Sequence, residues 1–319
     1  MIYDLIIIGG GPIGLNCALE AEKANLSYLI IEKGTIVNSI YNYPLYMTFF
    51  STADKLEIAK IPFISTAPKP GRREALEYYQ GITRQKNINI NLYEEVLKIT
   101  KEGNFTLETT KNTYHAKNVI IATGFYDFPN MMNVEGENLP KVHHYYKEPY
   151  PYANQKVVVI GSSNSSVDAA LETYRKGAKV TMIIRSSEFS KSVKYWVKPD
   201  MENRVKEKSI TAHFNSEVLE IKENSVIFQD ENGVVQEIEN DFVLALTGYL
   251  PNFKFLENSG IELQGDCLNP FYNPKTMETN VPDLYLAGVV CGGKDTHLWF
   301  IENSRIHAEM IVNNIISKN

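Results

Sequence analysis

Apolar residues along this chain gather in short continuous runs, and several of these runs end in turns rich in glycine. The first run covers residues 3–8 and contains four consecutive aliphatic residues. The turn that follows, residues 9–14, holds four glycines, and residues 15–24 then have the composition of a helix. A buried strand, a glycine turn and a helix in this order are typical of the βαβ unit that cradles a dinucleotide pyrophosphate.

The three glycines of this turn that match the dinucleotide-binding fingerprint each have a predicted task. Gly9 makes the tight turn, Gly11 lets the backbone approach the phosphates, and Gly14 lets the helix pack on the strand. Pro12 and Ile13 lie between these glycines. We therefore predict cofactor contacts at all five positions.

A second apolar run, residues 27–31, ends at Glu32 and Lys33. The position of Glu32 is close to the ~20-residue spacing expected for the acid that holds the ribose hydroxyls of a dinucleotide. The alternative is an ordinary exposed glutamate at a strand end. Motif and spacing together favour the ribose role, and we include Lys33 in the predicted site.

The opening pattern repeats later in the chain. Residues 155–160 form a buried run, residues 161–166 a turn, and residues 167–176 a helix that Gly177 ends. Two of the three fingerprint positions hold serine, which is small enough for close approach and has a hydroxyl that can bond a phosphate. The predicted contacts in this second turn are Gly161, Ser163, Asn164, Ser165 and Ser166.

The strand after the second turn, residues 180–184, ends in Arg185. An NAD site carries an acid at this place, whereas an arginine suits the extra phosphate of NADP. Lys191 and Lys194 are predicted to assist, and a solvated basic cluster is the alternative for these lysines.

Other segments are predicted to line the same sites. Buried strands end at 122–124 and at 247–248, and a last strand at 280–288 reaches the bound cofactor. The aromatic loop at 39–51 is either a packed surface loop or a wall beside a flat ring system. The predicted cofactor contacts in these segments are Tyr41, Tyr43, Thr48, Phe49, Ala122, Thr123, Gly124, Gly248, Gly288, Val289 and Phe300.

The remaining periodicity predicts a helix over 74–85, a small antiparallel insert with strands at 88–97 and 104–110, and a final helix over 298–317.

The length of 319 residues suggests about two domains. A net charge of −6 argues against a nucleic-acid partner, which requires a basic patch. No apolar stretch approaches the ~20 residues of a membrane span, and the first run does not have the form of a signal peptide. The sparse cysteines, Cys17, Cys267 and Cys291, indicate no disulfide framework, so we expect a cytoplasmic protein.

With these pieces in place, the chain resembles the low-molecular-weight thioredoxin reductase superfamily over essentially its whole length. The resemblance implies an α/β fold with two Rossmann-like, three-layer ββα dinucleotide-binding domains. Residues 1–125 and 249–319 would bind FAD, residues 150–247 would form an inserted NADPH domain, and residues 126–149 would connect them. In such enzymes NADPH reduces FAD, which reduces a CxxC disulfide. The matching positions lie near His144 and Lys147, and the chain contains no CxxC, so ordinary thioredoxin reductase chemistry is excluded.

Several segments resemble the bacilliredoxin (bacillithiol disulfide) reductase family more closely: residues 39–44, 48–51, 139–143, 287–289 and 300–303. This resemblance implies reduction of a low-molecular-weight or protein mixed disulfide of the bacillithiol type by a homodimer or homotetramer with a role in redox homeostasis. Many members carry a cysteine in the first glycine motif, where this chain has Ile13. Gly288-Val289 replaces the Gly-Asp of thioredoxin reductases, which removes one flavin contact.

Without that cysteine, another group would have to assist the disulfide chemistry. Cys291 follows the last strand in a glycine-rich position of the kind that can lower a thiol pKa, whereas Cys17 has the position of a core residue. His143, His144 and His297 are candidate proton donors, with a surface or structural histidine as the alternative for each. We therefore take Cys291 and His144 as the candidate catalytic residues.

Three rival functions stay open at this point. A ferredoxin–NADP or flavodoxin–NADP reductase shares the expected fold and also lacks CxxC. A small flavin monooxygenase is faintly suggested by residues 141–144, although the glycine of its motif is absent. A flavin-binding redox sensor without catalysis is the non-enzyme alternative.

Overall fold

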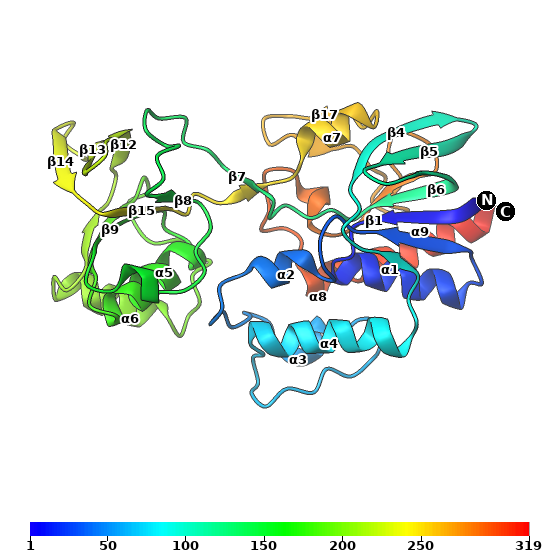
Figure 1. Ribbon diagram of the computed structural model, residues 1–319, viewed down its shortest axis with the longest axis horizontal. Coiled ribbons are helices and arrows are strands. Elements are labelled where there is room, and N and C mark those ends of the chain that lie inside the picture. The colour runs from blue at the N-terminus through cyan, green and yellow to red at the C-terminus, as the bar shows by residue number, and fades with distance from the viewer. Residues whose placement is uncertain (319) are drawn as a thin grey trace. The chain divides into compact units, whose positions relative to one another are not determined.

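A computed structural model describes residues 1–318 (Figure 1). The described chain divides into two compact units. The first unit consists of residues 1–43, 47–128 and 249–319, and the second of residues 44–46 and 129–248. The chain passes from the first unit to the second and back near two short strands, β7 (Phe128–Pro129) and β16 (Tyr249–Leu250).

The first unit is built on a sheet with the strand order β3-β2-β1-β6-β5-β4, to which β19 adds beside β6. Strands β3, β2, β1 and β6 run parallel to one another, and β19 is parallel to β6. Their bounds are β1 (Ile2–Ile8), β2 (Tyr28–Ile31), β3 (Ile90–Asn91), β6 (Thr113–Ile121) and β19 (Leu284–Leu286). Because both faces of the parallel part are covered, its strands are nearly continuous apolar runs rather than alternating ones.

An antiparallel pair, β4 (Val96–Glu102) and β5 (Asn104–Thr109), extends this sheet along the first half of β6. The predicted insert is thus present, but its predicted first strand is partly wrong. Residues 90–91 instead form β3, which pairs in parallel with Ile30 and Ile31 of β2. Only the segment from Val96 onward belongs to the antiparallel pair.

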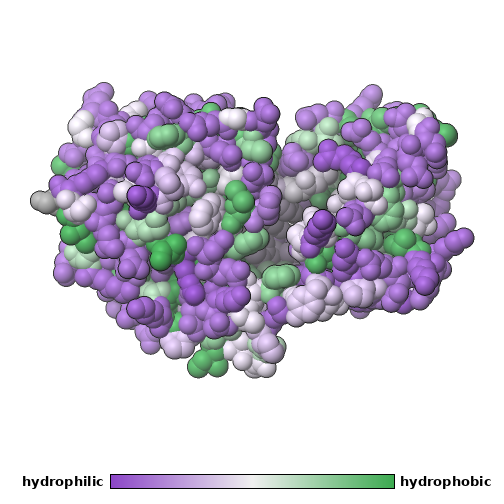
Figure 2. Space-filling model, turned by 180° about the vertical axis from the view of Figure 1, so that it is seen from behind, coloured by the Kyte–Doolittle hydropathy of each residue, from purple (hydrophilic) through white to green (hydrophobic). Residues whose placement is uncertain are grey.

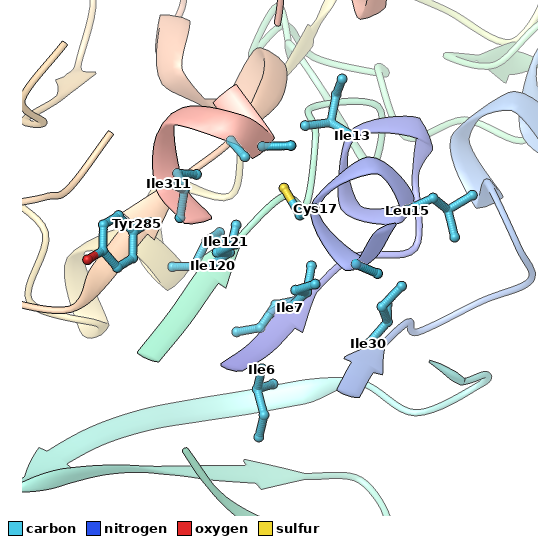
Figure 3. Packing of buried hydrophobic residues seen from close by; sticks show 14 of the residues in the cluster. Ile6, Ile7, Ile13, Leu15, Cys17, Ile30, Ile120, Ile121, Tyr285 and Ile311 are labelled. Atoms are coloured by element: carbon cyan, nitrogen blue, oxygen red, sulfur yellow. The ribbon is translucent and has the colours of Figure 1, made fainter. Parts of the chain in front are cut away.

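Helices α1 and α9 pack against each other beside this sheet. In Figure 3, Cys17 of α1 and Ile311 of α9 lie on the same side of the strands as Ile7, while Ile6 points to the opposite side. The helices of the first unit are α1 (Pro12–Lys23), α2 (Asn38–Asn42), α3 (Ala53–Leu56), α4 (Arg72–Gln85), α7 (Phe253–Asn258), α8 (Ile301–Ser304) and α9 (Ile306–Lys318), with a 3₁₀ turn η2 (Gly288–Gly292) and a small pair of strands β17 (Leu263–Gln264) and β18 (Asn269–Pro270).

The single final helix predicted over 298–317 is wrong in one respect, since the structure divides it at Arg305 into α8 and α9. The Asn16 side-chain amide donates a hydrogen bond of 2.7 Å to the Arg305 carbonyl oxygen. At the start of α8, the Asn303 side-chain oxygen accepts from the Phe300 N–H at 2.7 Å and caps the helix there. The residues before Phe300 therefore remain outside the helix.

The second unit has its own parallel sheet, with the order β11-β10-β9-β15-β8. A separate antiparallel sheet has the order β12-β13-β14. The elements are β8 (Val142–His143), η1 (Tyr150–Tyr152), β9 (Lys156–Ile160), α5 (Asn164–Arg175), β10 (Lys179–Ile183), α6 (Lys198–Lys206), β11 (Thr211–His213), β12 (Glu217–Ile221), β13 (Ser225–Gln229), β14 (Val235–Glu239) and β15 (Phe242–Ala245).

The boundary of the predicted connecting segment, 126–149, requires a correction. Residues 129–149 belong to the second unit, because β8 pairs in parallel with β15 at the edge of its sheet. A strand of two residues has no periodicity that a sequence pattern can detect, which explains the difference.

Each unit has its own apolar core, and the two sheets supply much of it. On the face drawn in Figure 2, hydrophilic residues cover most of the surface and apolar residues are scattered among them. Among residues 1–318, no helix is long and apolar enough to cross a lipid bilayer.

Candidate dinucleotide-binding sites

The first glycine turn connects β1 to α1, and two of its positions exclude any side chain. Gly9 has φ +109°, and a β-carbon there would lie 2.6 Å from the Ala122 carbonyl oxygen. A β-carbon on Gly14 would lie 1.9 Å from the Gly9 carbonyl oxygen. The strand end and the helix start therefore meet backbone to backbone, as the fingerprint predicts.

Gly11 differs from these two glycines because a β-carbon there would meet no described atom within 4 Å. Gly11 is also the N-cap residue of α1, Pro12 follows at the first helical position, and no side chain of the described residues caps this helix. The first N–H groups of α1 thus have no side-chain acceptor, and the space next to Gly11 is open. A phosphate group fits such a place, since helix N-termini bind anions through these donors.

Glu32 stands at the end of β2 and faces the same turn. Its Oε2 accepts from the Gly10 N–H at 2.7 Å, and its Oε1 accepts from the Gly34 N–H at 2.8 Å. The residue is only 6% exposed, and burial raises the pKa of its carboxyl group, against the lowering effect of the two backbone hydrogen bonds. Each carboxyl oxygen keeps a lone pair for a ribose hydroxyl, so the structure is compatible with the predicted role.

A pocket opens beside Glu32 and brings together segments that lie far apart in the sequence. Lys33 lines it and forms an ion pair of 2.8 Å with Asp127. The pocket also has lining residues for which the sequence analysis predicted no contact, among them Asn38, Glu94, Asn252 and Phe255. None of them belongs to a local motif, and only the fold places them next to Glu32.

Gly288 lies at the carboxyl end of β19 and packs on the first turn. It has φ +84°, and a β-carbon there would lie 3.4 Å from a side-chain carbon of Ile13. Ile13 is itself 8% exposed. Val289, the other predicted contact in this segment, is half-buried in η2. Ile13 therefore fills space between α1 and the turn after β19.

His307 is a residue of this region that the sequence analysis missed. The Gly288 N–H donates to its Nδ1 at 3.2 Å, so Nδ1 acts as an acceptor and the proton of the neutral ring is on Nε2. The residue is 1% exposed, and burial lowers its pKa to about 4. Within the described chain, Nε2 has no hydrogen-bond partner. His307 belongs to no sequence motif, so no local signal could have indicated it.

The three cysteines are free thiols in the structure. Burial raises the pKa of Cys291 and of Cys17, which favours the protonated thiol in both. The expectation that the position of Cys291 lowers its pKa is therefore wrong, because the residue is 3% exposed and desolvation outweighs the effect of the turn. This geometry disfavours Cys291 as a nucleophile.

The aromatic loop contains both packed and exposed rings. Tyr43 packs edge to face on Tyr126, with ring centroids 4.8 Å apart. Tyr41 is exposed, and the Arg72 guanidinium bonds its carbonyl oxygen and lies over its ring. Thr48 forms a bridge with Gly71. Tyr43 thus fits the packed-loop alternative, whereas Tyr41 is exposed with one face of its ring against Arg72.

The other contacts predicted for the first unit lie at the edges of its strands or on the surface. The Phe49 N–H donates to the Pro70 carbonyl oxygen at 2.9 Å. The Ala122 N–H donates to the Ile8 carbonyl oxygen at 2.8 Å, so the turn with Thr123 and Gly124 begins directly beside the end of β1. Phe300 is exposed.

The second glycine turn connects β9 to α5. Gly161 has φ +128°, and a β-carbon there would lie 2.5 Å from the Leu246 carbonyl oxygen. Ser166 is fully buried, and its hydroxyl donates to the Ser163 carbonyl oxygen at 2.8 Å. Ser163 is the N-cap of α5, and again no described side chain caps the helix. The N–H groups at this turn, including that of Ser165, therefore fit a pyrophosphate as those of α1 do.

Basic residues follow β10 in the second unit. Arg185 and Lys191 are exposed. Lys194 is 7% exposed, and its Nζ forms an ion pair of 2.7 Å with Asp168. The expectation that Lys194 assists a phosphate is therefore wrong, because its charge is used inside the unit. Gly248, the other predicted contact here, is exposed with φ +97°.

The candidate proton donors lie in different environments. His144 of the second unit is half-buried, 3.8 Å from the Glu137 carboxylate. Burial lowers the pKa of the neighbouring His143. His297 of the first unit is exposed. The described residues contain no group of three or more His, Cys, Asp or Glu side chains that could hold a metal ion.

A family model described as pyridine nucleotide-disulphide oxidoreductase matches residues 6–288. The chain belongs to this family. The protein "Bacilliredoxin reductase Bdr" of Bacillus subtilis is 48% identical over 315 residues, which cover 98% of this chain and 97% of that protein. The solved structure "Bacillithiol Disulfide Reductase Bdr (YpdA) from Bacillus cereus" is 45% identical, with a TM-score of 0.98 over 100% of both chains. A "Ferredoxin--NADP reductase" of Ignicoccus hospitalis is 24% identical over 295 residues and covers 89% of each chain.

Family membership confirms the resemblance and the α/β fold with two Rossmann-like domains. The chain is an enzyme of the flavoprotein oxidoreductase class, and its cofactors are FAD and NADPH. The open turn at Gly11 and the uncapped starts of α1 and α5 agree with this assignment.

Proposed function

We propose that this enzyme uses NADPH to reduce a low-molecular-weight disulfide of the bacillithiol type, or a protein that carries such a mixed disulfide. The full-length similarity to a bacilliredoxin reductase, at 48% identity, carries the proposal. The absence of CxxC from the sequence agrees with it, since the electrons must then reach the external disulfide without an internal disulfide relay.

In this proposal the first unit binds FAD and the second binds NADPH. The uncapped N-terminus of α1 and the space at Gly11 would receive the FAD pyrophosphate, and the Glu32 carboxylate would accept from its ribose hydroxyls. In the second unit, the start of α5 would receive the NADPH pyrophosphate, and the exposed Arg185 would receive the 2′-phosphate. The opposite charges of Glu32 and Arg185 support this division of the two nucleotides between the two units.

When bound, FAD and NADPH supply the redox chemistry, in which NADPH, a proton and RSSR′ give NADP⁺, RSH and R′SH. The protein holds the nucleotides and shields the reacting region. The buried Ile13 side chain packs against Gly288 beside the first turn, at the position where many members of the resembled family carry a cysteine. His144, whose Nε2 lies 3.8 Å from the Glu137 carboxylate, remains the candidate proton donor for the leaving thiolate.

The proposed setting is a homodimer or homotetramer in the cytoplasm. The three free thiols support a reducing compartment. Sedimentation of the FAD-loaded enzyme tests the oligomeric state, and a monomer at micromolar concentration would contradict it.

An anaerobic stopped-flow experiment tests the proposed reaction. NADPH should bleach the flavin absorbance, and bacillithiol disulfide or a bacillithiolated protein should then restore it within the turnover time. Ferredoxin and oxygen are offered in parallel. Rapid reoxidation by oxygen alone would contradict the disulfide reductase function.

A ferredoxin–NADP reductase is the second candidate, because a protein of that description matches 89% of this chain at 24% identity. Ferredoxin as the fastest oxidant in the same experiment would favour it. A flavin that NADPH does not bleach would contradict both enzyme functions and favour a sensor.

A further inference from the structure

The segment Phe189–Lys194 of the second unit lies directly beside the second glycine turn. The Ser190 N–H donates to the Ser162 carbonyl oxygen at 3.0 Å, which ties the segment to the turn itself. Phe189 and Val193 are each 4% exposed and anchor it in the apolar core, whereas Lys191 between them is exposed. The segment therefore presents one cation from a fixed backbone.

Two residues one turn apart on α5 grip the end of this segment. The Asn164 side chain accepts from the Lys194 N–H at 2.9 Å and donates to the Ser192 carbonyl oxygen at 2.8 Å. Asp168 forms the 2.7 Å ion pair with the buried Lys194 ammonium group. Since residues at i and i+4 lie on one face of a helix, α5 holds both the main chain and the side chain of Lys194.

Arg185, which leaves the same edge of the sheet after β10, also has a fixed backbone. The flanking Ile184 N–H donates to the His213 carbonyl oxygen at 2.9 Å, and the Ser186 carbonyl oxygen accepts from the Asn215 N–H at 3.1 Å. The Arg185 side chain is nonetheless exposed. Arg185 and Lys191 are thus two exposed cations that follow β10 on loops whose main chains are fixed by hydrogen bonds.

We propose that Asn164 and Asp168 are positioning residues that determine coenzyme specificity, because they hold Lys191 where it joins Arg185 in binding the 2′-phosphate of NADPH. This inference rests on the proposed binding of NADPH to the second unit. It assigns the Asn164 side chain to the segment, since both of its polar atoms are already used there, and leaves the predicted pyrophosphate contact to the Asn164 N–H, which Asn164→Ala retains. Lys194 supports the segment, and Lys191 carries the charge.

The test compares two probes that differ only in the 2′-phosphate, adenosine 2′,5′-bisphosphate and 5′-AMP, by calorimetry on the FAD-loaded full-length enzyme. Asn164→Ala should weaken the bisphosphate about tenfold, the effect of about one charge-assisted hydrogen bond, and change 5′-AMP by less than about twofold. Asn164→Asp keeps the acceptor for the Lys194 N–H and should recover part of the loss. Asn203→Ala, an exposed asparagine on α6, is the matched control and should change neither probe.

A double-mutant cycle gives a second readout. Lys191→Ala should weaken binding of the bisphosphate by a similar factor. Asn164→Ala in that background should add little, because Asn164 acts on the 2′-phosphate only through Lys191. Equal weakening of both probes by Asn164→Ala, or additive losses in the cycle, would overturn the inference and leave the NADPH assignment standing. A wild-type enzyme that does not prefer the bisphosphate would overturn both.

Discussion

The two glycine turns of this protein differ at their last position, which is Gly14 in the first and Ser166 in the second. In the first turn, a β-carbon on Gly14 would lie 1.9 Å from the Gly9 carbonyl oxygen. In the second, the real β-carbon of Ser166 lies 3.3 Å from an ideal β-carbon on Gly161. The helix of the second turn therefore leaves room for the two side-chain atoms of a serine, and glycine is not required there.

The strands that follow the two turns end in opposite charges. Glu32 is buried and accepts two backbone N–H groups, whereas Arg185 is exposed at the surface of its unit. A carboxylate suits two ribose hydroxyls, and a guanidinium suits a phosphate. The comparison teaches that the same strand–turn–helix backbone can favour different nucleotides, and that side chains such as Glu32 and Arg185 make the difference.

Gly14→Ala should break the comparison most severely. The new methyl group cannot fit without separating α1 from β1, so we expect a loss of about 4 kcal/mol or more in the free energy of unfolding, together with loss of FAD. Urea denaturation and flavin absorbance measure the two effects. Gly81→Ala, in α4 with no atom within 4 Å of the new methyl group, is the control and should not destabilise the protein. A Gly14→Ala protein that retains FAD at normal stability would contradict the backbone contact.

Acid should weaken the first unit through His307. Burial lowers its pKa from 6.5 to about 4, so the unfolded chain binds a proton that the folded chain refuses in this range. Stability is then full above pH 6.5 and falls by about 3 kcal/mol as the pH approaches 4. Urea midpoints measured over this range test the slope.

The variant His307→Asn keeps an acceptor for the Gly288 N–H but removes the titration, so its slope should be shallower. The difference between the two proteins separates His307 from His143 and His213, whose pKa values burial also lowers. His297→Asn, at an exposed site, should leave the wild-type slope intact. Equal slopes in wild type and His307→Asn would contradict this assignment.

The two turns and the residues at the ends of their strands could be predicted because their signals are local. A buried run, a glycine turn and a charged residue at a known spacing stand within about 30 residues of one another. The fold class follows from the repetition of this pattern and is confirmed by the family and by the solved relative. The roles of Glu32 and Arg185 in binding remain predictions.

What the sequence could not reveal depends on contacts between distant segments. His307 meets Gly288 only because α9 packs on α1. Glu94 lines the pocket with Glu32 only because β3 pairs with β2, after which the Glu94 N–H donates to the Glu32 carbonyl oxygen at 3.0 Å. The buried state of Cys291 depends on the core around η2, and the pairing of Lys194 with Asp168 on the path of a loop. Periodicity contains no information on such partners, so a lysine that looked free was paired.

Arg185→Ala sharpens the comparison at the strand ends. Loss of a guanidinium–phosphate contact should lower the preference of kcat/KM for NADPH over NADH by about 10- to 100-fold, with little change for NADH. NADPH- and NADH-dependent flavin bleaching under anaerobic conditions provides both constants. Arg175→Ala, an exposed arginine of α5 paired with Asp200, is the matched control. If NADH were weakened as much as NADPH, Arg185 would serve the fold rather than the phosphate.

Ser166→Ala should have the smallest effect and tests whether the serine hydroxyl serves the ligand. In the structure this hydroxyl donates to the Ser163 carbonyl oxygen, which also accepts from the Val167 N–H at 3.0 Å. The carbonyl therefore keeps a donor after the substitution, and we expect a loss of about 0.5–1 kcal/mol in stability with an unchanged KM for NADPH. A KM that rises about tenfold at unchanged stability would mean that the hydroxyl turns to the phosphate when NADPH binds. The second turn would then owe its serine to nucleotide binding rather than to the wider spacing between its helix and strand.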